Sequence, residues 1–296
     1  MRFATASLAL LPAVAQAVNI VSANDDGWAE INIRTLYNSL TSAGHDVLVS
    51  APAENKSGAG SLTGTPTVLT EACEFNSCPS GSPAVGYNSS APQFNYVNSY
   101  PATAMEYGIE TLAPGYFGGA PDLAVTGPNV GVNTGVISFI SGTVGAAIEA
   151  VTLGVPAIAF SGAEGSATAW NVAAPAYATI YGELGAIVVD AIVASGTPYL
   201  PDETFLNVNF PETTDCTSAS DFSFVLSRIY TAVPLVSGTD VVTCNNGGRL
   251  PTETKVVGTD GCYASISLGG TNKRDSSAAN QAVVLSKLSS ILTCLP

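Results

Sequence analysis

Short apolar runs and segments of helical spacing alternate along the chain up to Pro211. Residues 18–23 (VNIVSA) form a β-branched run, and residues 31–43 place apolar side chains at i, i+3, i+4 and i+7 counted from Ile33. That spacing is typical of one face of a helix, whereas residues 46–52 (DVLVSAP) are typical of a buried strand ended by proline. A strand, a helix and a strand in one sheet require a right-handed parallel crossover. The pattern therefore predicts a βαβ unit at the start of the fold.

The same alternation continues further along the chain. It predicts a strand over 121–127, a small-residue helix over 138–154, a strand over 155–162, a helix over 170–195 and a strand over 204–211. After this point the sequence becomes rich in Thr, Ser, Gly and Asn, which favours hairpins or an irregular extension, and a helix over about 276–293 closes the chain. We therefore predict an α/β protein with a doubly wound, Rossmann-like parallel sheet over about 18–211 and a C-terminal β-rich extension over about 212–296.

The N-terminus has the pattern of a secretory signal peptide. Residues 1–17 carry Arg2, then an apolar stretch, then a small-residue cleavage signal at Ala15-Gln16-Ala17. No later run reaches the roughly 18 to 20 uninterrupted apolar residues that a membrane helix needs. We expect a secreted protein with no membrane partner, whose mature chain is one domain beginning at Val18.

Six cysteines fit an oxidising compartment, because their number is even and none forms a CxxC pair with nearby histidines. We expect three disulfides, with Cys73 and Cys78 as a local pair. Three pairings remain open for the other four, which are Cys216, Cys244, Cys262 and Cys294.

The charge balance excludes one class of partner. With 23 acidic and 9 basic residues and a net charge of −14, the surface repels polyanions, so binding of a nucleic-acid polymer through basic patches is not expected. Two glycosylation acceptor patterns occur, at Asn55 and at Asn88, and the second lies in the more polar loop.

Polar side chains follow the predicted strands at the points where these strands end. The carboxyl ends of parallel strands share one edge of the sheet, where ligands bind in such folds. Hard oxygen and amide donors gather in these loops, which contain Asp25 and Asp26, then Asn55 and Ser57, then Asn129 and Asn133, and finally Ser141, Gly142 and Thr143 at a helix start.

Two adjacent carboxylates repel each other unless a cation lies between them. Carboxylate, amide and hydroxyl oxygens select Mg²⁺, Mn²⁺ or Ca²⁺ over zinc, so Asp25 and Asp26 are expected to hold a divalent metal. The SGT segment at a helix start offers backbone N–H groups to an anion. Each motif alone is a common turn or cap, and their joint placement at successive strand ends favours a functional site.

Four segments in this order resemble the SurE family of metal-dependent survival-protein phosphatases, which hydrolyse nucleoside monophosphates and other phosphomonoesters. The segments are NIVSANDDG (19–27), AGHDVLVSAPAENKSGAGSLT (43–63), PDLAVTGPNVGVNTG (121–135) and SGTVGAAIEAVTLGVPAIAFS (141–161). The resemblance covers residues 18 to about 162 and implies a SurE-like fold, a small phosphomonoester substrate and assembly into dimers or larger oligomers.

The resemblance also implies residue roles. Asp25, Asp26, Ser57 and Asn129 would be metal ligands, with Mg²⁺ or Mn²⁺ as the metal and the two aspartates as catalytic residues. The phosphate pocket would contain Asn55, Asn133, Ser141, Gly142 and Thr143. The expected reaction is a 5′- or 3′-nucleotidase or acid phosphatase hydrolysis by metal-activated water.

The chain departs from the family pattern in three places, which bear on substrate preference. WAEIN follows NDDG where the family usually has a His/Ala/Pro/Gly stretch. SYPATAM (99–105) stands where the family has a Gly-Thr-Pro-x-Asp-Cys segment, and Pro128 stands where an aliphatic residue is usual. One alternative mechanism makes Asp25 a covalent nucleophile, but phosphatases that resemble the haloacid dehalogenase group use Asp-x-Asp. The alternative of another class is a non-catalytic secreted protein that keeps the metal site and only binds an anion or a partner.

Three further features are interpreted as structural or left open. His45, the only histidine, is expected at the far edge of the sheet, so leaving-group protonation would come from water or a carboxyl, which suits an acidic pH optimum. Trp28 could stack on a substrate base or cover the first loop. Lys273 and Arg274 form a dibasic pair that fits a solvated turn or a processing site.

Overall fold

The computed structural model describes residues 17–296, so the predicted signal peptide lies outside the described residues except for Ala17. The strands are β1 (Asn19–Ala23), β2 (Asp46–Pro52), β3 (Val85–Asn88), β4 (Ala91–Val97), β5 (Leu123–Val130), β6 (Ala157–Gly162), β7 (Thr204–Phe210), β8 (Ser223–Ser227), β9 (Tyr263–Gly270) and β10 (Leu292–Thr293). The helices are α1 (Ile31–Ser42), α2 (Pro101–Tyr107), α3 (Ala113–Tyr116), α4 (Ile137–Ile140), α5 (Gly142–Thr152), α6 (Ala176–Ala194), α7 (Glu253–Val257) and α8 (Ala278–Lys287). Single helical turns occur at Glu74–Asn76, Gly108–Leu112 and Ala219–Asp221.

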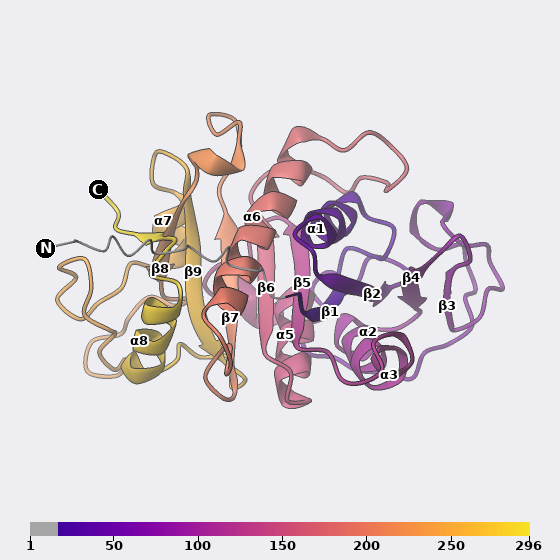
Figure 1. Ribbon diagram of the computed structural model, residues 1–296, viewed down its shortest axis with the longest axis horizontal. Helices are drawn as coiled ribbons and strands as arrows, with labels where there is room; N and C mark the ends of the chain where they lie inside the picture. Colours follow the sequence, from indigo (N-terminus) through magenta and orange to yellow (C-terminus); the bar gives the residue numbers. More distant parts are fainter. Residues whose placement is uncertain (1–16) are drawn as a thin grey trace, which may run out of the picture.

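Within residues 17–296 the strands form one ten-stranded sheet in the order β10-β8-β9-β7-β6-β5-β1-β2-β4-β3. Strand β1 pairs in parallel with both β2 and β5, and only the β3–β4 and β7–β9 pairs are antiparallel. Helices α1 and α6 pack together on one side of the central strands, and α2 and α5 pack together on the other (Figure 1). The structure therefore confirms the predicted doubly wound α/β fold.

Two apolar layers hold the helices on the sheet. The layer beneath α1 and α6 includes Phe160, Tyr181 and Phe210, whose stacked rings are buried, with centroids 5.4 to 5.9 Å apart between neighbours. The layer beneath α2 and α5 is built mainly from small residues, including Ala124, Ala147 and Ala159. Helix α6 has the length and apolar composition of a membrane span, but such helices also occur in protein cores, and this one packs against α1 and the sheet. The small side chains let α5 lie close to the sheet.

The structure differs from the predicted elements in two informative places. The predicted helix over 138–154 is broken at Ser141, whose extended backbone ends α4 and caps α5. The hairpins expected in the extension are wrong, because β8 and β9 are parallel, and β9 joins the central sheet antiparallel to β7. The Thr- and Ser-rich texture suited strands but carried no information about their pairing.

Disulfides close the parts of the fold at the two ends of the sheet. Cys73 pairs with Cys78, as predicted, beside β3 and β4. The two pairs that the sequence left open are Cys216–Cys262 and Cys244–Cys294. Both disulfides link segments within the C-terminal extension, which lies at the opposite end of the sheet from β3 and β4 (Figure 1). Within residues 17–296 no cysteine is left free.

Candidate metal and phosphate site

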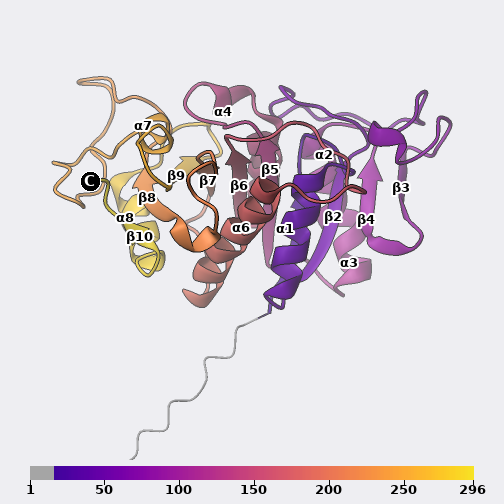
Figure 2. The same cartoon turned by 90° about the horizontal axis from the view of Figure 1, so that it is seen from above.

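Asp25 and Asp26 lie directly after β1, in a turn that the neighbouring Asn24 fixes. The Asn24 side-chain amide donates to the Gly27 carbonyl at 2.9 Å, and the Gly27 N–H donates back to Asn24 Oδ1 at 3.2 Å. Both aspartates are only 2% exposed. The turn therefore holds two carboxyl groups under the surface at the edge where α4 and several long loops gather (Figure 2).

Helix α5 begins against Asp25. The Thr143 hydroxyl donates to Asp25 Oδ1 at 2.6 Å, and a Cβ on Gly142 would stand 2.8 Å from the Asp25 Cβ, so this approach requires glycine. Burial raises the pKa of Asp25, while the Thr143 hydroxyl and the first backbone N–H groups of α5 oppose that rise. The positive end of the helix dipole thus faces the first carboxylate.

Asp26 accepts hydrogen bonds from the end of β5 and from the loop after β2. The Val130 N–H donates to Asp26 Oδ2 at 3.0 Å, and the Asn55 amide donates to Asp26 Oδ1 at 3.4 Å. Burial raises the pKa of Asp26 well above its usual range, and the neighbouring Asp25 charge raises it further. No ion pair in residues 17–296 includes either aspartate, so this carboxylate pair lacks a cationic partner from the protein.

The loop after β2 brings Asn55 and Ser57 to the same edge. The Lys56 N–H donates to the Asp25 carbonyl at 2.7 Å, and the Ser57 N–H donates to Asn55 Oδ1 at 2.8 Å. Both Asn55 and Ser57 are exposed, in contrast to the aspartates. At Gly145 the helix α5 passes so close to the backbone of this loop that any Cβ would clash with it. Solvent therefore reaches the site from the side of this loop.

Two asparagines predicted in the site are both buried but bond different partners. Asn129, next to the Val130 that bonds Asp26, turns its amide nitrogen to the Gly131 carbonyl at 2.6 Å. Asn133 is buried, and its amide nitrogen donates to Thr143 Oγ1 at 3.3 Å and to Ser161 Oγ at 2.9 Å. Asn133 therefore supports the Thr143–Asp25 contact from behind.

The structure brings all nine predicted residues to one edge of the sheet, but their exposures differ. Thr143 and Ser141 already use their hydroxyls within the protein, the latter to accept from the Val144 N–H at 3.1 Å as the helix cap. Asn55 and Ser57 are the exposed members of the set. The ligand and phosphate roles of these residues remain predictions.

A buried polar layer behind the site was missed by the sequence analysis. Asn209 Oδ1 accepts from the Asn133 N–H at 2.7 Å, and the Asn207 amide donates to the Asn133 carbonyl at 2.9 Å. These two asparagines, with Ser161 on β6, lie on fully buried strands. Polar residues at alternate positions of an otherwise apolar strand, as in NVNF, were the available signal.

The rim of the site contains a lysine that the sequence analysis set aside as part of a turn. The Lys273 ammonium donates to the Phe139 carbonyl at 2.9 Å and lies 4.9 Å from the centre of the Phe139 ring. Four apolar side chains around α4 are exposed on the same rim, and they are Val136, Ile137, Phe139 and Ile140. The Gly60 N–H donates to the Ile140 carbonyl at 2.9 Å, which joins this rim to the loop after β2.

The structure resolves the two remaining open interpretations. Trp28 is buried, packs on Tyr96 and donates its indole N–H to Ser77 Oγ at 2.8 Å, so it covers the first loop and is not available for stacking on a substrate. His45 lies at the start of β2, at the opposite edge from the aspartates, where its Nε2 is 3.0 Å from Asp190. Neither residue belongs to the site.

The donor set fits a hard divalent cation. Two buried carboxylates without a cationic partner gain most from a bound positive charge, and the Asn129 and Ser57 oxygens are the neutral donors that Mg²⁺ or Mn²⁺ accept. No group of three His, Cys, Asp or Glu side chains in the described part of the chain is arranged for a metal. A cation here would therefore rely on two carboxylates completed by neutral oxygens, which does not suit zinc.

Comparison with known proteins agrees with this arrangement. The family model described as survival protein SurE matches residues 20–230. An acid phosphatase of Yarrowia lipolytica is 33% identical over 91% of this chain and 84% of its own length. A 5′-nucleotidase SurE of Solidesulfovibrio magneticus is 35% identical over 66% of each chain. The crystal structure of a SurE protein from Aquifex aeolicus has the same fold, with a TM-score of 0.57 and 22% identity over 86% of this chain and 93% of that one.

Proposed function

This chain belongs to the SurE family, and we propose from that premise that it is a secreted, metal-dependent enzyme that hydrolyses nucleoside monophosphates or related small phosphomonoesters. The broad activity is that of a phosphatase or nucleotidase, since relatives of both names match the chain. Secretion, the metal and the substrate are the proposed part.

One observation carries the proposal. Asp25 and Asp26 are adjacent and buried, and no ion pair in residues 17–296 involves them. Burial of two like charges without a counter-charge destabilises a fold, because the desolvation cost is not offset. A site kept in this state is therefore suited to binding a cation, and the adjacent N-terminus of α5 is suited to binding an anion.

The chain's own residues prepare the site for phosphoryl transfer to water. A bound Mg²⁺ or Mn²⁺ would supply charge neutralisation and Lewis acidity. Thr143 orients Asp25 through its 2.6 Å hydrogen bond, and Val130 orients Asp26 through its N–H. Asn55 and Ser57 line the open side, where a phosphate would enter. The ammonium of Lys273 on the rim provides a positive charge near this entrance.

The test is hydrolysis by the purified mature protein. Release of inorganic phosphate is measured from nucleoside 5′- and 3′-monophosphates, from p-nitrophenyl phosphate and from polyphosphate, before and after treatment with a chelator. We expect turnover that the chelator abolishes and that Mg²⁺ or Mn²⁺ restores. Turnover that resists complete metal removal would contradict the metal-dependent mechanism, and no turnover with any metal or substrate would favour the non-catalytic alternative.

Secretion is tested separately from catalysis. N-terminal sequencing of secreted protein is expected to give Val18 as the first residue, and thiol titration after denaturation is expected to find no free thiol. We expect glycan at Asn88 and not at Asn55, because the Asn55 amide contacts Asp26 and a sugar there would block the site. A retained N-terminus, or full glycan occupancy at Asn55 in active protein, would contradict these expectations.

A further inference from the structure

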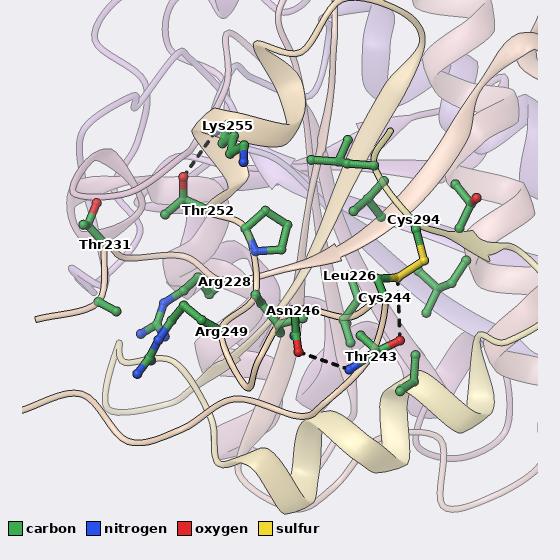
Figure 3. Close-up of a pocket in the computed structure, with 18 of the residues that line it drawn as sticks. Leu226, Arg228, Thr231, Thr243, Cys244, Asn246, Arg249, Thr252, Lys255 and Cys294 are labelled. Atoms are coloured by element: carbon green, nitrogen blue, oxygen red, sulfur yellow. Dashed lines mark hydrogen bonds between the residues drawn. A yellow bond between two sulfur atoms is a disulfide. The ribbon is translucent and has the colours of Figure 1, made fainter. Parts of the chain in front are cut away.

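A cavity of about 660 Å³ lies in the C-terminal extension, away from the candidate site. Strands β8 and β10, helix α8 and the chain from Thr231 to Lys255 form its walls. Its volume falls within the roughly 300–1,000 Å³ of small-molecule sites. The Cys244–Cys294 disulfide links two of these walls covalently (Figure 3).

The lining has a charge that is unusual for this protein. The chain has nine basic residues in total, and three of them, Arg228, Arg249 and Lys255, line the cavity. None of the described lining residues is Asp or Glu, although the chain contains 23 acidic residues. In a protein of net charge −14, this cavity is therefore a local site of positive lining.

The three cations are not equally available to a ligand. Arg228 is committed to the protein, because it pairs with Asp240 at 2.7 Å and Asp275 at 3.1 Å and donates to the Tyr230 carbonyl at 2.6 Å. Arg249 uses one terminal nitrogen, for the Gly238 carbonyl at 2.7 Å and for Asp240 at 3.4 Å. Within residues 17–296 its Nε and Nη2 have no hydrogen-bond partner.

Lys255 is the cation with the fewest commitments. Within residues 17–296 its ammonium forms no ion pair, and the side chain is exposed on α7. The nearby Asp240 does not compete for it, since this carboxylate already accepts from Arg228, Arg249, the Leu250 N–H and the Gln281 amide. Lys255 and Arg249 therefore offer unused donors to an anion.

The rest of the cavity is apolar. Leu226, Leu250, Leu285 and Leu292 contribute to the lining. In the view of Figure 3 Arg228 and Arg249 lie on the left with Lys255 above them, Leu226 lies near the centre, and the Cys244–Cys294 disulfide lies on the right. A lining that combines cationic donors with leucines matches a ligand with an anionic head and an apolar tail.

We propose that this cavity binds an amphipathic anion, such as a single-chain carboxylate of medium length. The charged head lies on the side of the cavity that carries the cationic donors, and the apolar tail lies against the leucines of β8, β10 and α8. Such a ligand contains no phosphoester bond, so binding here is independent of the proposed hydrolysis.

The experiment titrates the mature protein with decanoate in a calorimeter at low salt, with acetate as a head without a tail and octanol as a tail without a charge. We expect saturable 1:1 binding of decanoate and much weaker binding of acetate. The double variant Lys255→Gln with Arg249→Gln should lose about fivefold or more in decanoate affinity, the scale of one or two partly screened charge pairs, and keep its affinity for octanol. Arg274→Gln, which removes an exposed cation elsewhere, is the matched control.

A second variant tests the place of binding without removing charge. Ser289→Trp places a large side chain at an exposed lining position just after α8 and should weaken the binding of decanoate and octanol alike. An unchanged melting temperature would show that the fold persists. No saturable decanoate binding, or equal affinity in all variants, would overturn the proposal. A dimer in sedimentation that Ser289→Trp dissociates, together with no decanoate binding, would mean that a second copy of the chain covers the cavity. Asp26→Asn protein should bind decanoate normally whatever its hydrolytic activity.

Discussion

Two acidic pairs, one at the carboxyl edge of the central strands and one in the C-terminal extension, have contrasting surroundings. Asp25 and Asp26 accept hydrogen bonds only from neutral donors and form no ion pair in the described chain. Asp240 and Asp275 both contact the buried Arg228. Asp25, Asp26 and Asp240 are buried and Asp275 is partly buried, but only the pair in the extension has a counter-charge from the protein. Under the proposed function, the contrast separates a pair that stabilises the fold from a pair that binds a cation.

The same contrast extends to how each region is held together. The edge that carries Asp25 is fixed by backbone geometry, with α5 packed against it through Gly142 and Gly145. The extension is fixed by cross-links, since two disulfides with sequence separations of 46 and 50 close it and Arg228 joins Asp240 to Asp275. Long loops gain most from such closure.

Removing the counter-charge in the extension should have the largest effect. Arg228→Met leaves the buried Asp240 and the partly buried Asp275 without their main partner, and breaking a buried pair in this way costs about 3–5 kcal/mol. Chemical denaturation of the mature protein measures the change in the free energy of unfolding. Arg249→Met, whose side chain is 40% exposed and also contacts Asp240, is the control and should cost about 1 kcal/mol or less. Equal losses in the two variants would show that Arg228 is no more important than a surface cation.

The opposite result is expected at the site. Asp26→Asn removes one of two like charges at nearly constant shape, so the metal-free protein should be as stable as wild type or more so. Hydrolysis should fall by about 100-fold or more, the scale of losing a positioned electrostatic group, and added metal should restore part of it. Initial rates across a metal titration, with melting temperatures alongside, measure both effects. Asp260→Asn, at an exposed acid, is the control.

Near-wild-type turnover of Asp26→Asn at limiting metal would end the metal-site proposal. A large drop in the stability of the metal-free Asp26→Asn protein would contradict the contrast between the two pairs, because Asp26 would then be a structural residue like Asp240. The two variants therefore test the contrast from both sides.

The sequence predicted the site edge well because strand ends and motifs are local features. The strand at 46–52 matches β2, and the loops that contain Asp25, Asn55 and Asn133 meet as expected from parallel topology. The SGT motif was correctly expected at a helix start, but the predicted range 138–154 ran the helix on through the apolar ISFI segment, whose Ile137, Phe139 and Ile140 are exposed. Exposure depends on neighbours that periodicity does not contain.

Long-range pairings could not be predicted for the same reason. Arg228 meets Asp275 across 47 positions and Lys273 meets Phe139 across 134, and nothing in the local pattern marks either contact. The buried Asn133–Asn209 contact likewise depends on the order of the strands in the sheet. Composition suggested disulfides, but only the fold chooses Cys216–Cys262 over its alternatives.

The smallest expected effect concerns Glu30, a buried acid between the first loop and α1. Burial raises the pKa of Glu30 to about 7 from 4.5, although its carboxylate caps α1 by accepting from the Asn32 N–H. A raised acid pKa means that the folded state keeps its proton where the unfolded chain has released it. The metal-free protein should then lose stability as pH rises from about 4.5 to about 7.

Glu30→Gln keeps the capping oxygen and removes the titrating carboxyl group. The unfolding free energy of this variant should therefore depend less steeply on pH. The difference in slope should be at most about 1.4 kcal/mol per pH unit, the ceiling set by one proton. Glu253, whose pKa burial raises to about 8, remains in both proteins and cancels in the comparison. Denaturant titrations of both proteins in chelator at pH 5, 6 and 7 measure it. Parallel slopes would show that Glu30 is ionised in the folded state. A third buried negative charge would then lie beside Asp26, and this edge of the sheet would need a bound cation even more than Asp25 and Asp26 alone require.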